Sequence, residues 1–302
     1  MKIFLTGATG VMGTSAARAL LDAGHDVSGL ARTAEKADSL DELGVTPVHA
    51  NLFDSDQLAG AVAGHDVVCN LATHVPVGLG GMRARAWRLN DRIRIEGSRV
   101  VAEAAAAAGV RRLIQESISF LYADGGDEWI DEQSAMTVTR ATEPAAVAET
   151  NALAFKRASR DTVVLRFGSI MGDDPLTRWR FARARSGQPV GIGDPRGWAH
   201  VVHPDDVGSA VVAALTAPGG VYNVGAAPVR RADLNAGFFH AAGQDRAAYL
   251  PKMVVRLAGE RLEPLTRSHR ISSQVFSDST GWRPRHPSFA EGWLSSLMVG
   301  AT

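Results

Sequence analysis

The chain has 302 residues, of which 45% are hydrophobic and 21% are charged, so it is long enough for one large domain or a main domain with a smaller lobe. Its formal net charge is zero and no block of like charge occurs, which disfavours nucleic acid and anionic membranes and favours a small-molecule substrate. The single cysteine, Cys69, excludes a disulfide framework and a cysteine zinc site. No segment is apolar for long enough to be a signal peptide or a membrane span, which predicts a cytoplasmic protein. Nothing in the sequence indicates an oligomeric state.

Short apolar runs alternate with helical patterns through the first half of the chain. This alternation is typical of the α/β class, in which a parallel sheet carries helices on both faces. The expected strands are residues 2–6, 26–30, 46–50, 66–72, 112–116 and 162–167, and the expected helices are residues 11–23, a short helix ending near residue 63, and a long helix over 83–108.

After residue 167 the pattern changes, because glycine- and proline-rich turns interrupt the chain. A helix over residues 207–215 and a strand over 221–224 follow, and the last third shows no sheet pattern. Residues 1–170 and 197–226 are therefore expected to form a Rossmann-type doubly wound domain. Residues 171–196 and 227–302 are expected to form a smaller, C-terminal substrate-binding lobe over the carboxyl edge of the sheet, where such sheets bind ligands.

A glycine-rich turn directly follows the first expected strand and directly precedes the first expected helix. Glycine permits the tight turn and the close approach of backbone to a pyrophosphate, and the helix N-terminus offers free amides and a positive dipole end. This context predicts a dinucleotide site. The residues expected around the pyrophosphate are Gly7, Thr9, Gly10, Val11, Met12 and Gly13.

The spacing of this turn, Thr6-Gly7-Ala8-Thr9-Gly10-Val11-Met12-Gly13, resembles the signature of the extended short-chain dehydrogenases/reductases. Residues 70–72, 165–172, 202–207 and 221–224 resemble later landmarks of that family, so the resemblance covers most of the chain. Residues 115–117, 129–132 and 287–289 resemble a divergent bacterial branch labelled NAD-dependent epimerase/dehydratase. The resemblance implies a Rossmann-type fold with a nicotinamide cofactor. It also implies cofactor contacts from Leu71, Ala72, Thr73, Phe167, Gly168 and Ile170.

The end of the second expected strand favours NADP(H) over NAD(H). An NAD site places a carboxylate there, whereas this chain has Ala31 followed by Arg32, which can pair with a 2′-phosphate. Asn51 and Leu52 stand where relatives often have Asp-Leu beside the adenine, and the asparagine can still accept a hydrogen bond. Arg94, on one helix face with Asn90, is a candidate for the pyrophosphate, although a surface pair is an equal alternative.

The proton donor of the extended family is missing. In that family a tyrosine four residues before a lysine delivers the proton, and none of the three tyrosines here is followed by a lysine at that distance. Alignment on the family's motifs puts the tyrosine and lysine positions near Ala141 and Ala145 and the usual serine position at Ile118. Lys156 lies too close to the strand over 162–167 to be the family lysine.

Three side chains remain as catalytic candidates. Ser117, at a strand's carboxyl end, could contact the substrate or the nicotinamide ribose, and Tyr122 is a fainter candidate. His74 could donate a proton near neutral pH, with a loop histidine as an equal alternative. No metal site is expected, because His200 and His203 are three apart in an extended segment and face opposite sides.

Three functions fit these observations. The first is an NADPH-dependent ketoreductase for a bulky aromatic, polyketide-like carbonyl compound, in which proximity and a hydroxyl of the substrate replace the tyrosine. Atypical reductases of this kind occur in antibiotic tailoring, and the angucyclinone ketoreductases of the simocyclinone type are a branch that the chain resembles. The second is a nucleotide-sugar epimerase or dehydratase. The third is a non-catalytic NADP(H)-sensing protein.

Overall fold

A seven-stranded parallel sheet forms the centre of the protein, and the computed structural model describes residues 1–257 and 259–299. The strand order is β11-β7-β5-β4-β1-β2-β3, and every neighbouring pair is parallel. The α/β, Rossmann-type prediction is confirmed. The strands are β1 (Lys2–Thr6), β2 (Asp26–Ala31), β3 (Thr46–His49), β4 (Val67–Asn70), β5 (Arg112–Ile118), β7 (Asp161–Phe167) and β11 (Gly220–Val224).

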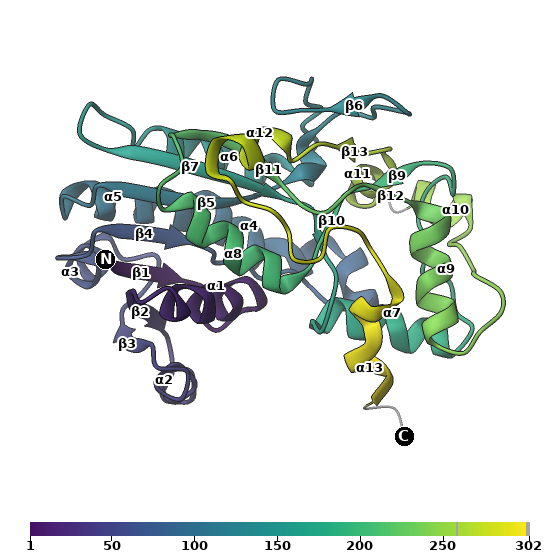
Figure 1. Ribbon diagram of the computed structural model, residues 1–302, viewed down its shortest axis with the longest axis horizontal. Coiled ribbons are helices and arrows are strands. Elements are labelled where there is room, and N and C mark those ends of the chain that lie inside the picture. Colours follow the sequence, from purple (N-terminus) through teal and green to yellow (C-terminus); the bar gives the residue numbers. More distant parts are fainter. Residues whose placement is uncertain (258, 300–302) are drawn as a thin grey trace.

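Helices cover both faces of this sheet. On one face α1 (Val11–Asp22) and α8 (Pro204–Ala214) lie side by side, and α2 (Ala34–Asp41) belongs to the same core (Figure 1). On the other face α3 (Ser55–Val62), α5 (Ser98–Ala107) and α6 (Glu143–Leu153) form the second layer. Burial on both faces explains why β1 and β4 consist mostly of apolar residues, including Cys69, which is a fully buried core thiol.

The long helix expected over residues 83–108 is interrupted. A 3₁₀ turn (Ala84–Trp87) leads into the short helix α4 (Arg88–Arg92), a π-helical turn follows at Ile93–Gly97, and α5 completes the segment. π-helical turns re-aim side chains and occur often at functional sites. Arg94 lies inside this turn.

Segments from the second half of the chain form a lobe beyond the carboxyl ends of the strands (Figure 1). Phe181, Phe238, Phe239 and Trp293 lie in a separate core there. Its elements are α7 (Pro175–Arg185), α9 (Arg231–Ala241), α10 (Lys252–Leu257), α11 (Glu263–Thr266), α13 (Ser295–Val299) and the antiparallel pair β9 (Trp198–Ala199) and β12 (Val229–Arg230).

Two short strand pairs join this lobe to the sheet. They are β8 (Ser169–Ile170) with β10 (Val201–Val202), and β6 (Trp129–Ile130) with β13 (Arg270–Ile271). Helix α12 (Gln274–Thr280), which the sequence assigned to the lobe, packs instead against β11, and Phe276 and Trp282 belong to the core of the sheet.

The turn between β1 and α1 depends on two close approaches. Gly7 has a φ of +68°, and a Cβ atom there would lie 2.6 Å from the carbonyl oxygen of Leu71. A Cβ atom on Gly13 would lie 2.1 Å from the carbonyl oxygen of Gly7. Helix α1 is capped by Gly10 without any side-chain cap, so the turn presents backbone to a ligand.

Two glycine-to-alanine substitutions separate this constraint from ordinary helix propensity. Gly13→Ala should lower the free energy of unfolding by about 1–3 kcal/mol, because the new methyl group overlaps the Gly7 carbonyl. Gly60→Ala, in α3 with open space around it, should raise the same quantity by about 0.5–1 kcal/mol. Urea unfolding measures both, and a Gly13→Ala variant as stable as Gly60→Ala would contradict the packing described.

Candidate active site

A cavity of about 260 Å³ opens at the carboxyl edge of the sheet, between the ends of β4 and β5, the start of α6, helix α7 and the C-terminal lobe. Most of the described side chains around it are apolar, and the charged groups among these are four arginines. The apolar lining includes Val75, Pro76, Trp87, Ile118, Phe120, Ala141, Ala145, Leu176, Trp179, Val190, Ile192, Leu250, Leu262, Pro264 and Leu265. The polar lining consists of Asn90, Arg94, Thr142, Ser169, Arg180, Arg183 and Arg261.

The three positions assigned to the family's catalytic groups meet at this cavity. Ile118 ends β5, Ala145 lies in the first turns of α6, and Ala141 precedes that helix, yet all three contribute to the same wall. Their convergence supports the alignment that assigned them. An isoleucine and two alanines cannot transfer a proton, so the wall of the cavity is chemically inert where the family has its acid.

Ser117, predicted as a catalytic and cofactor contact, points away from the cavity. Strand β5 is still extended there, so Ser117 and Ile118 face opposite sides of the sheet. The Ser117 hydroxyl is fully buried and donates to Glu149 Oε1 over 2.6 Å. Glu149 also binds the guanidinium of Arg166 at 2.8 and 2.7 Å. The hydroxyl therefore stabilises a buried ion pair and has no path to a substrate in the cavity.

Tyr122, another catalytic candidate, is likewise fully buried. Its hydroxyl donates to Asn223 Oδ1 and accepts from Arg166 Nη1, both over 2.8 Å. Burial raises the pKa of Tyr122, opposed by the nearby Arg166 cation. A raised pKa and a closed hydrogen-bond network make this phenol a structural group, in contrast to its predicted role.

The third catalytic candidate, His74, has an exposed side chain that is outside the cavity lining. Its backbone amide donates to Asn90 Oδ1 over 3.0 Å, and Asn90 is buried and lines the cavity. Asn90 thus fixes the loop after β4. The exposed imidazole of His74 therefore fits a loop histidine and not a proton donor in the cavity.

Arg94, the pyrophosphate candidate, is held by a buried carboxylate. Its Nη2 lies 2.9 Å from Glu116 Oε2, and both side chains are almost fully buried. Burial raises the pKa of Glu116, with Arg94 acting in the opposite direction. The Arg94 Nε is buried and has no hydrogen-bond partner among the described residues, and Arg94 contributes to the cavity lining.

The remaining cofactor candidates fall into two groups. Leu71, Ala72 and Phe167 are buried, and the first two pack against the glycine turn, so they shape the site through backbone and packing. A Cβ atom on Gly168 would lie 2.9 Å from the backbone of His200, which explains the glycine by packing. The partly or fully accessible candidates are Thr9, Gly10, Val11, Arg32, Asn51, Thr73 and Ile170, whereas Met12 and Leu52 are buried.

Arg32 stands directly after β2 with an exposed side chain, at the start of the turn into α2. The next residue, Thr33, caps α2 by accepting a hydrogen bond from the Lys36 amide. Ala31, at the position of an NAD-binding carboxylate, is buried. Asn51 already accepts the Phe53 amide at 3.1 Å, which orients its carboxamide. The cradle made by Gly7 and Gly13 and this strand end fit a dinucleotide.

Two hydroxyl groups at the cavity were not among the predicted site residues. Ser169 begins β8 just after β7 and lines both the main cavity and a smaller one beside it. Thr142 precedes α6, and its Oγ1 accepts the Thr139 amide over 3.0 Å. Ser169 lies within the segment that resembles the nicotinamide-side loop, so its place in that motif could have identified it.

A smaller cavity of about 90 Å³ adjoins the main one, and His200 lines it. Neither ring nitrogen of His200 has a hydrogen-bond partner among the described residues. Burial lowers the pKa of His200 to about 3, and burial likewise lowers the pKa of His269, which lines the same cavity, to about 4. Both imidazoles are therefore neutral at physiological pH.

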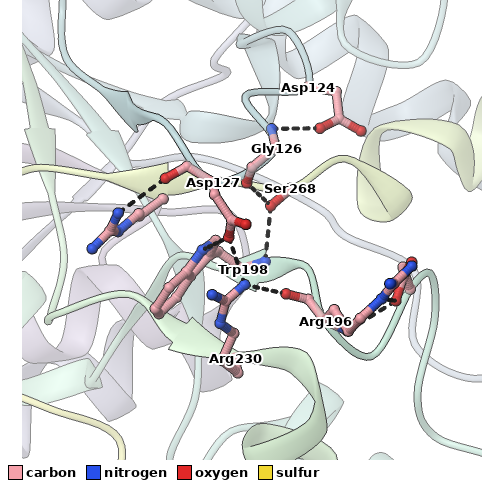
Figure 2. Close-up of polar contacts among 9 residues, drawn as sticks. Asp124, Gly126, Asp127, Arg196, Trp198, Arg230 and Ser268 are labelled. Carbon is pink, nitrogen blue, oxygen red and sulfur yellow. Dashed lines mark hydrogen bonds and ion pairs between the residues drawn. The ribbon is translucent and has the colours of Figure 1, made fainter.

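The outer wall of this small cavity is fixed by a polar cluster around Trp198, shown in Figure 2. The Asp127 carboxylate accepts from Trp198 Nε1 at 2.9 Å and from Arg230 at 2.7 Å. Arg230 also lies over the indole ring, 3.8 Å from its centroid. The Ser268 hydroxyl accepts the Trp198 amide and donates to the Gly126 carbonyl. These contacts tie the lobe to the loop after β5.

His203 lies apart from His200, as expected, but it has a different neighbour. Its ring centroid is 3.7 Å from that of His286, and Asp205 Oδ2 lies 3.5 Å from His203 and 3.4 Å from His286. These three side chains are close enough to hold a metal ion. His203 Nδ1 already accepts the Asp205 amide as the cap of α8, and none of the three lines either cavity.

The fold and this site define a class of protein. Residues 3–225 match the model of the NAD dependent epimerase/dehydratase family, so the chain belongs to that family. A relative similar along the whole length is a 3-diazoavenalumate denitrifying reductase from a Streptomyces species, 31% identical over 97% of this chain and 99% of its own. A ketoreductase of 4-hydroxy-2-methyl-3-oxo-4-farnesyl-3,4-dihydroquinoline-1-oxide from Stigmatella aurantiaca is 30% identical over 41% of this chain and 36% of its own. The family and these names indicate an oxidoreductase.

Solved structures share the fold at lower identity. The UDP-glucose 4-epimerase of Thermus thermophilus, solved in complex with NAD, superposes with a TM-score of 0.78 at 20% identity over all of both chains. A dTDP-glucose 4,6-dehydratase from Streptomyces venezuelae, solved as a double mutant with NAD, superposes with the same TM-score at 18% identity over 98% of this chain and 97% of its own. In the described part of this chain no helix is both long and apolar enough to cross a membrane.

The two buried histidines predict how stability depends on pH. Because burial depresses their pKa in the folded state, protonation favours the unfolded chain, and stability is lost as pH falls from 6.5 toward 4. Each such group contributes a slope of about 1.4 kcal/mol per pH unit in that range. His200→Gln should remove one of the two contributions in urea unfolding at pH 7, 6, 5 and 4, with the exposed His49→Gln as the substitution control. An unchanged slope in the His200 variant would contradict the burial of a neutral imidazole.

Proposed function

We propose that this chain is an NADPH-dependent reductase that transfers hydride to a bulky, apolar aromatic carbonyl compound whose own hydroxyl group polarises the carbonyl. The observation that carries the proposal is the wall formed by Ile118, Ala141 and Ala145. A reductase with no protein acid at the carbonyl needs another hydrogen-bond donor there, and a neighbouring phenol of the substrate provides one.

The preference for NADPH rests on the end of β2. The exposed Arg32 can pair with a 2′-phosphate, while the buried Ala31 offers no carboxylate to the ribose. Gly7 and Gly13 keep the pyrophosphate position open, and the uncapped amides of α1 face it. When bound there, the cofactor supplies the hydride.

The chain's own residues bind and orient the acceptor. The apolar walls exclude water from the reacting carbonyl and hold the aromatic system in place, and positioning of this kind is worth about 7–11 kcal/mol at its upper limit. The carbonyl carbon gains the hydride, the oxygen gains the proton of the neighbouring phenol, and the phenolate recovers a proton from water. Ser169 and Thr142 are the lining hydroxyls that can hydrogen-bond to the phenol or to the carbonyl oxygen of the acceptor.

A diazo compound is a second candidate acceptor, favoured by the full-length similarity to the 3-diazoavenalumate denitrifying reductase. An arenediazonium group accepts hydride without help from an acid and leaves as dinitrogen, with a C–H bond formed in its place. Loss of the tyrosine would cost nothing in that reaction, so the same inert wall fits it.

The other two functions fit this site less well. Epimerisation of a nucleotide sugar begins with removal of a hydroxyl proton by a protein base, and the cavity wall has none at the family position. A purely sensing protein has no need for an apolar cavity of about 260 Å³ beside the cofactor site.

Matched acceptors test the proposal directly. With NADPH, an ortho-hydroxyaryl ketone should be reduced at least about 100-fold faster than its O-methyl ether, because methylation removes the internal donor. Absorbance at 340 nm follows the ketones, and release of dinitrogen follows an arenediazonium salt. Equal rates for the ketone and its ether would contradict substrate assistance, and no turnover of any acceptor would favour the sensor.

Alanine variants of the lining hydroxyls test where the proton comes from. Ser169→Ala and Thr142→Ala should each lower kcat less than about tenfold, because these hydroxyls orient the substrate without protonating it. Steady-state reduction of the ortho-hydroxyaryl ketone measures kcat in each variant. A loss of about 1000-fold in either variant would identify a protein acid and contradict the proposal.

Cofactor choice is tested at Arg32. Arg32→Ala should weaken NADPH binding by about 10-fold or more and leave NADH binding unchanged, because only NADPH has the 2′-phosphate. Fluorescence titration of each cofactor measures both constants. Arg18→Ala, an exposed arginine on α1, controls for the change in net charge. Equal affinities of the unmodified protein for NADPH and NADH would contradict the preference.

A further inference from the structure

Arg180 stands where the two cavities meet. It lies in the middle of α7, and it lines both the main cavity and the smaller one beside it. Its surroundings there are apolar and include Leu265, Val190 and Ile192, which also line both cavities. The guanidinium is thus a cation beside a space whose lining is mostly apolar.

The hydrogen-bond partners of Arg180 are few. Its Nη1 lies 3.6 Å from the sulfur of Met171, a weak acceptor, and no carboxylate lies within ion-pair distance of it in the part of the chain that the structure describes. The Asp174 carboxylate acts on its charge, but that carboxylate already accepts the Leu176 and Thr177 amides as the cap of α7. The guanidinium therefore keeps most of its donors free.

Two of the other three arginines of the cavity differ from Arg180 in this respect. Arg94 is paired with the buried carboxylate of Glu116. Arg183 donates to Gln188 Oε1 at 2.8 Å and to the Pro189 carbonyl at 3.0 Å. Arg261 lies near enough to Asp91 to influence its pKa. Arg261, like Arg180, has no hydrogen bond or ion pair to an acceptor among the described residues, but it lines the main cavity alone, whereas Arg180 lines both cavities.

An unpaired guanidinium in an apolar cavity is unfavourable, and burial lowers the pKa of Arg180 accordingly. An anionic ligand group would remove that cost, and a carboxylate matches the guanidinium fork with two parallel hydrogen bonds.

We propose that Arg180 binds a carboxylate of the substrate, so that the acceptor is an aromatic carboxylic acid whose ring system fills the main cavity. This inference rests on the proposed function for the reactive end of the molecule. The inference adds a carboxylate at the other end of the substrate and makes Arg180 the residue that determines specificity for acidic over neutral acceptors.

A binding experiment that needs no turnover tests the anion site. The probes are 6-hydroxy-2-naphthoate and its methyl ester, titrated by calorimetry into the protein saturated with NADP⁺. The free acid should bind about 10- to 100-fold more tightly than the ester, because the ester cannot form two charge-assisted bonds. Equal binding of acid and ester overturns the proposal.

Variants on one helix assign the effect to one residue. Arg180→Gln should abolish the preference for the acid, Arg180→Lys should keep part of it, and Arg183→Gln, on the same helix and the same cavity, should keep all of it. The affinity for NADP⁺ should be unchanged in Arg180→Gln. A tenfold loss of NADP⁺ affinity in Arg180→Gln would show that Arg180 contributes to cofactor binding. Full retention of the preference for the acid would show that Arg180 does not bind the carboxylate. Either result would contradict the proposal.

Thermal unfolding without ligand gives a second readout. Arg180→Met should raise the melting temperature, because it removes an unpaired cation, and excess 6-hydroxy-2-naphthoate should stabilise only the unmodified protein. A lower melting temperature with the binding preference lost would mean that Arg180 is structural. Failure of the reductase is distinguished by turnover: acid-selective binding without any hydride transfer contradicts the proposed function alone, and reduction of neutral and acidic ketones at equal rates contradicts the anion site alone.

Discussion

Two buried ion pairs at the end of β5 determine what the active-site cavity can contain. Glu149 holds Arg166 and the hydroxyl of Ser117, and Glu116 holds Arg94 at the cavity wall. Removing one partner of such a pair costs about 3–5 kcal/mol, because the other charge stays buried without compensation. The buried polar groups of β5 are therefore committed to the fold, and the cavity lining beside them is mostly apolar.

The two faces of β5 therefore have different roles, one in stability and one in ligand binding. On the face of β5 that carries Ser117, hydroxyl and charged groups hydrogen-bond to one another, and Tyr122 belongs to this closed network. On the opposite face, which borders the cavity, Ile118, Ala141 and Ala145 present only hydrocarbon where the family has its proton donor. Such a site can still accelerate hydride transfer by holding both reactants and excluding water, provided that the acceptor is activated by its own substituents.

The sequence predicted the parts of the structure that depend on local pattern. The positions of the sheet strands, the glycine turn at Gly7 and the alignment that brought Ala141 to the cavity wall all follow from spacing along the chain. The role of Ser117 could not be read in the same way, because its partner Glu149 comes from a distant helix. The sequence likewise could not predict that Arg180 lacks a carboxylate partner, because the neighbours of a side chain are set by the fold and not by the local segment.

The central claim is that the proton comes from the acceptor and not from the protein. The pH dependence of kcat, measured for a series of ortho-hydroxyaryl ketones whose phenols carry different ring substituents, tests it most directly, because the profile reports the ionisation of the group that donates the proton. We predict that the apparent pKa of kcat moves with the pKa of the substrate phenol. An apparent pKa that stays the same throughout the series would show that a group on the protein supplies the proton, and would contradict this account.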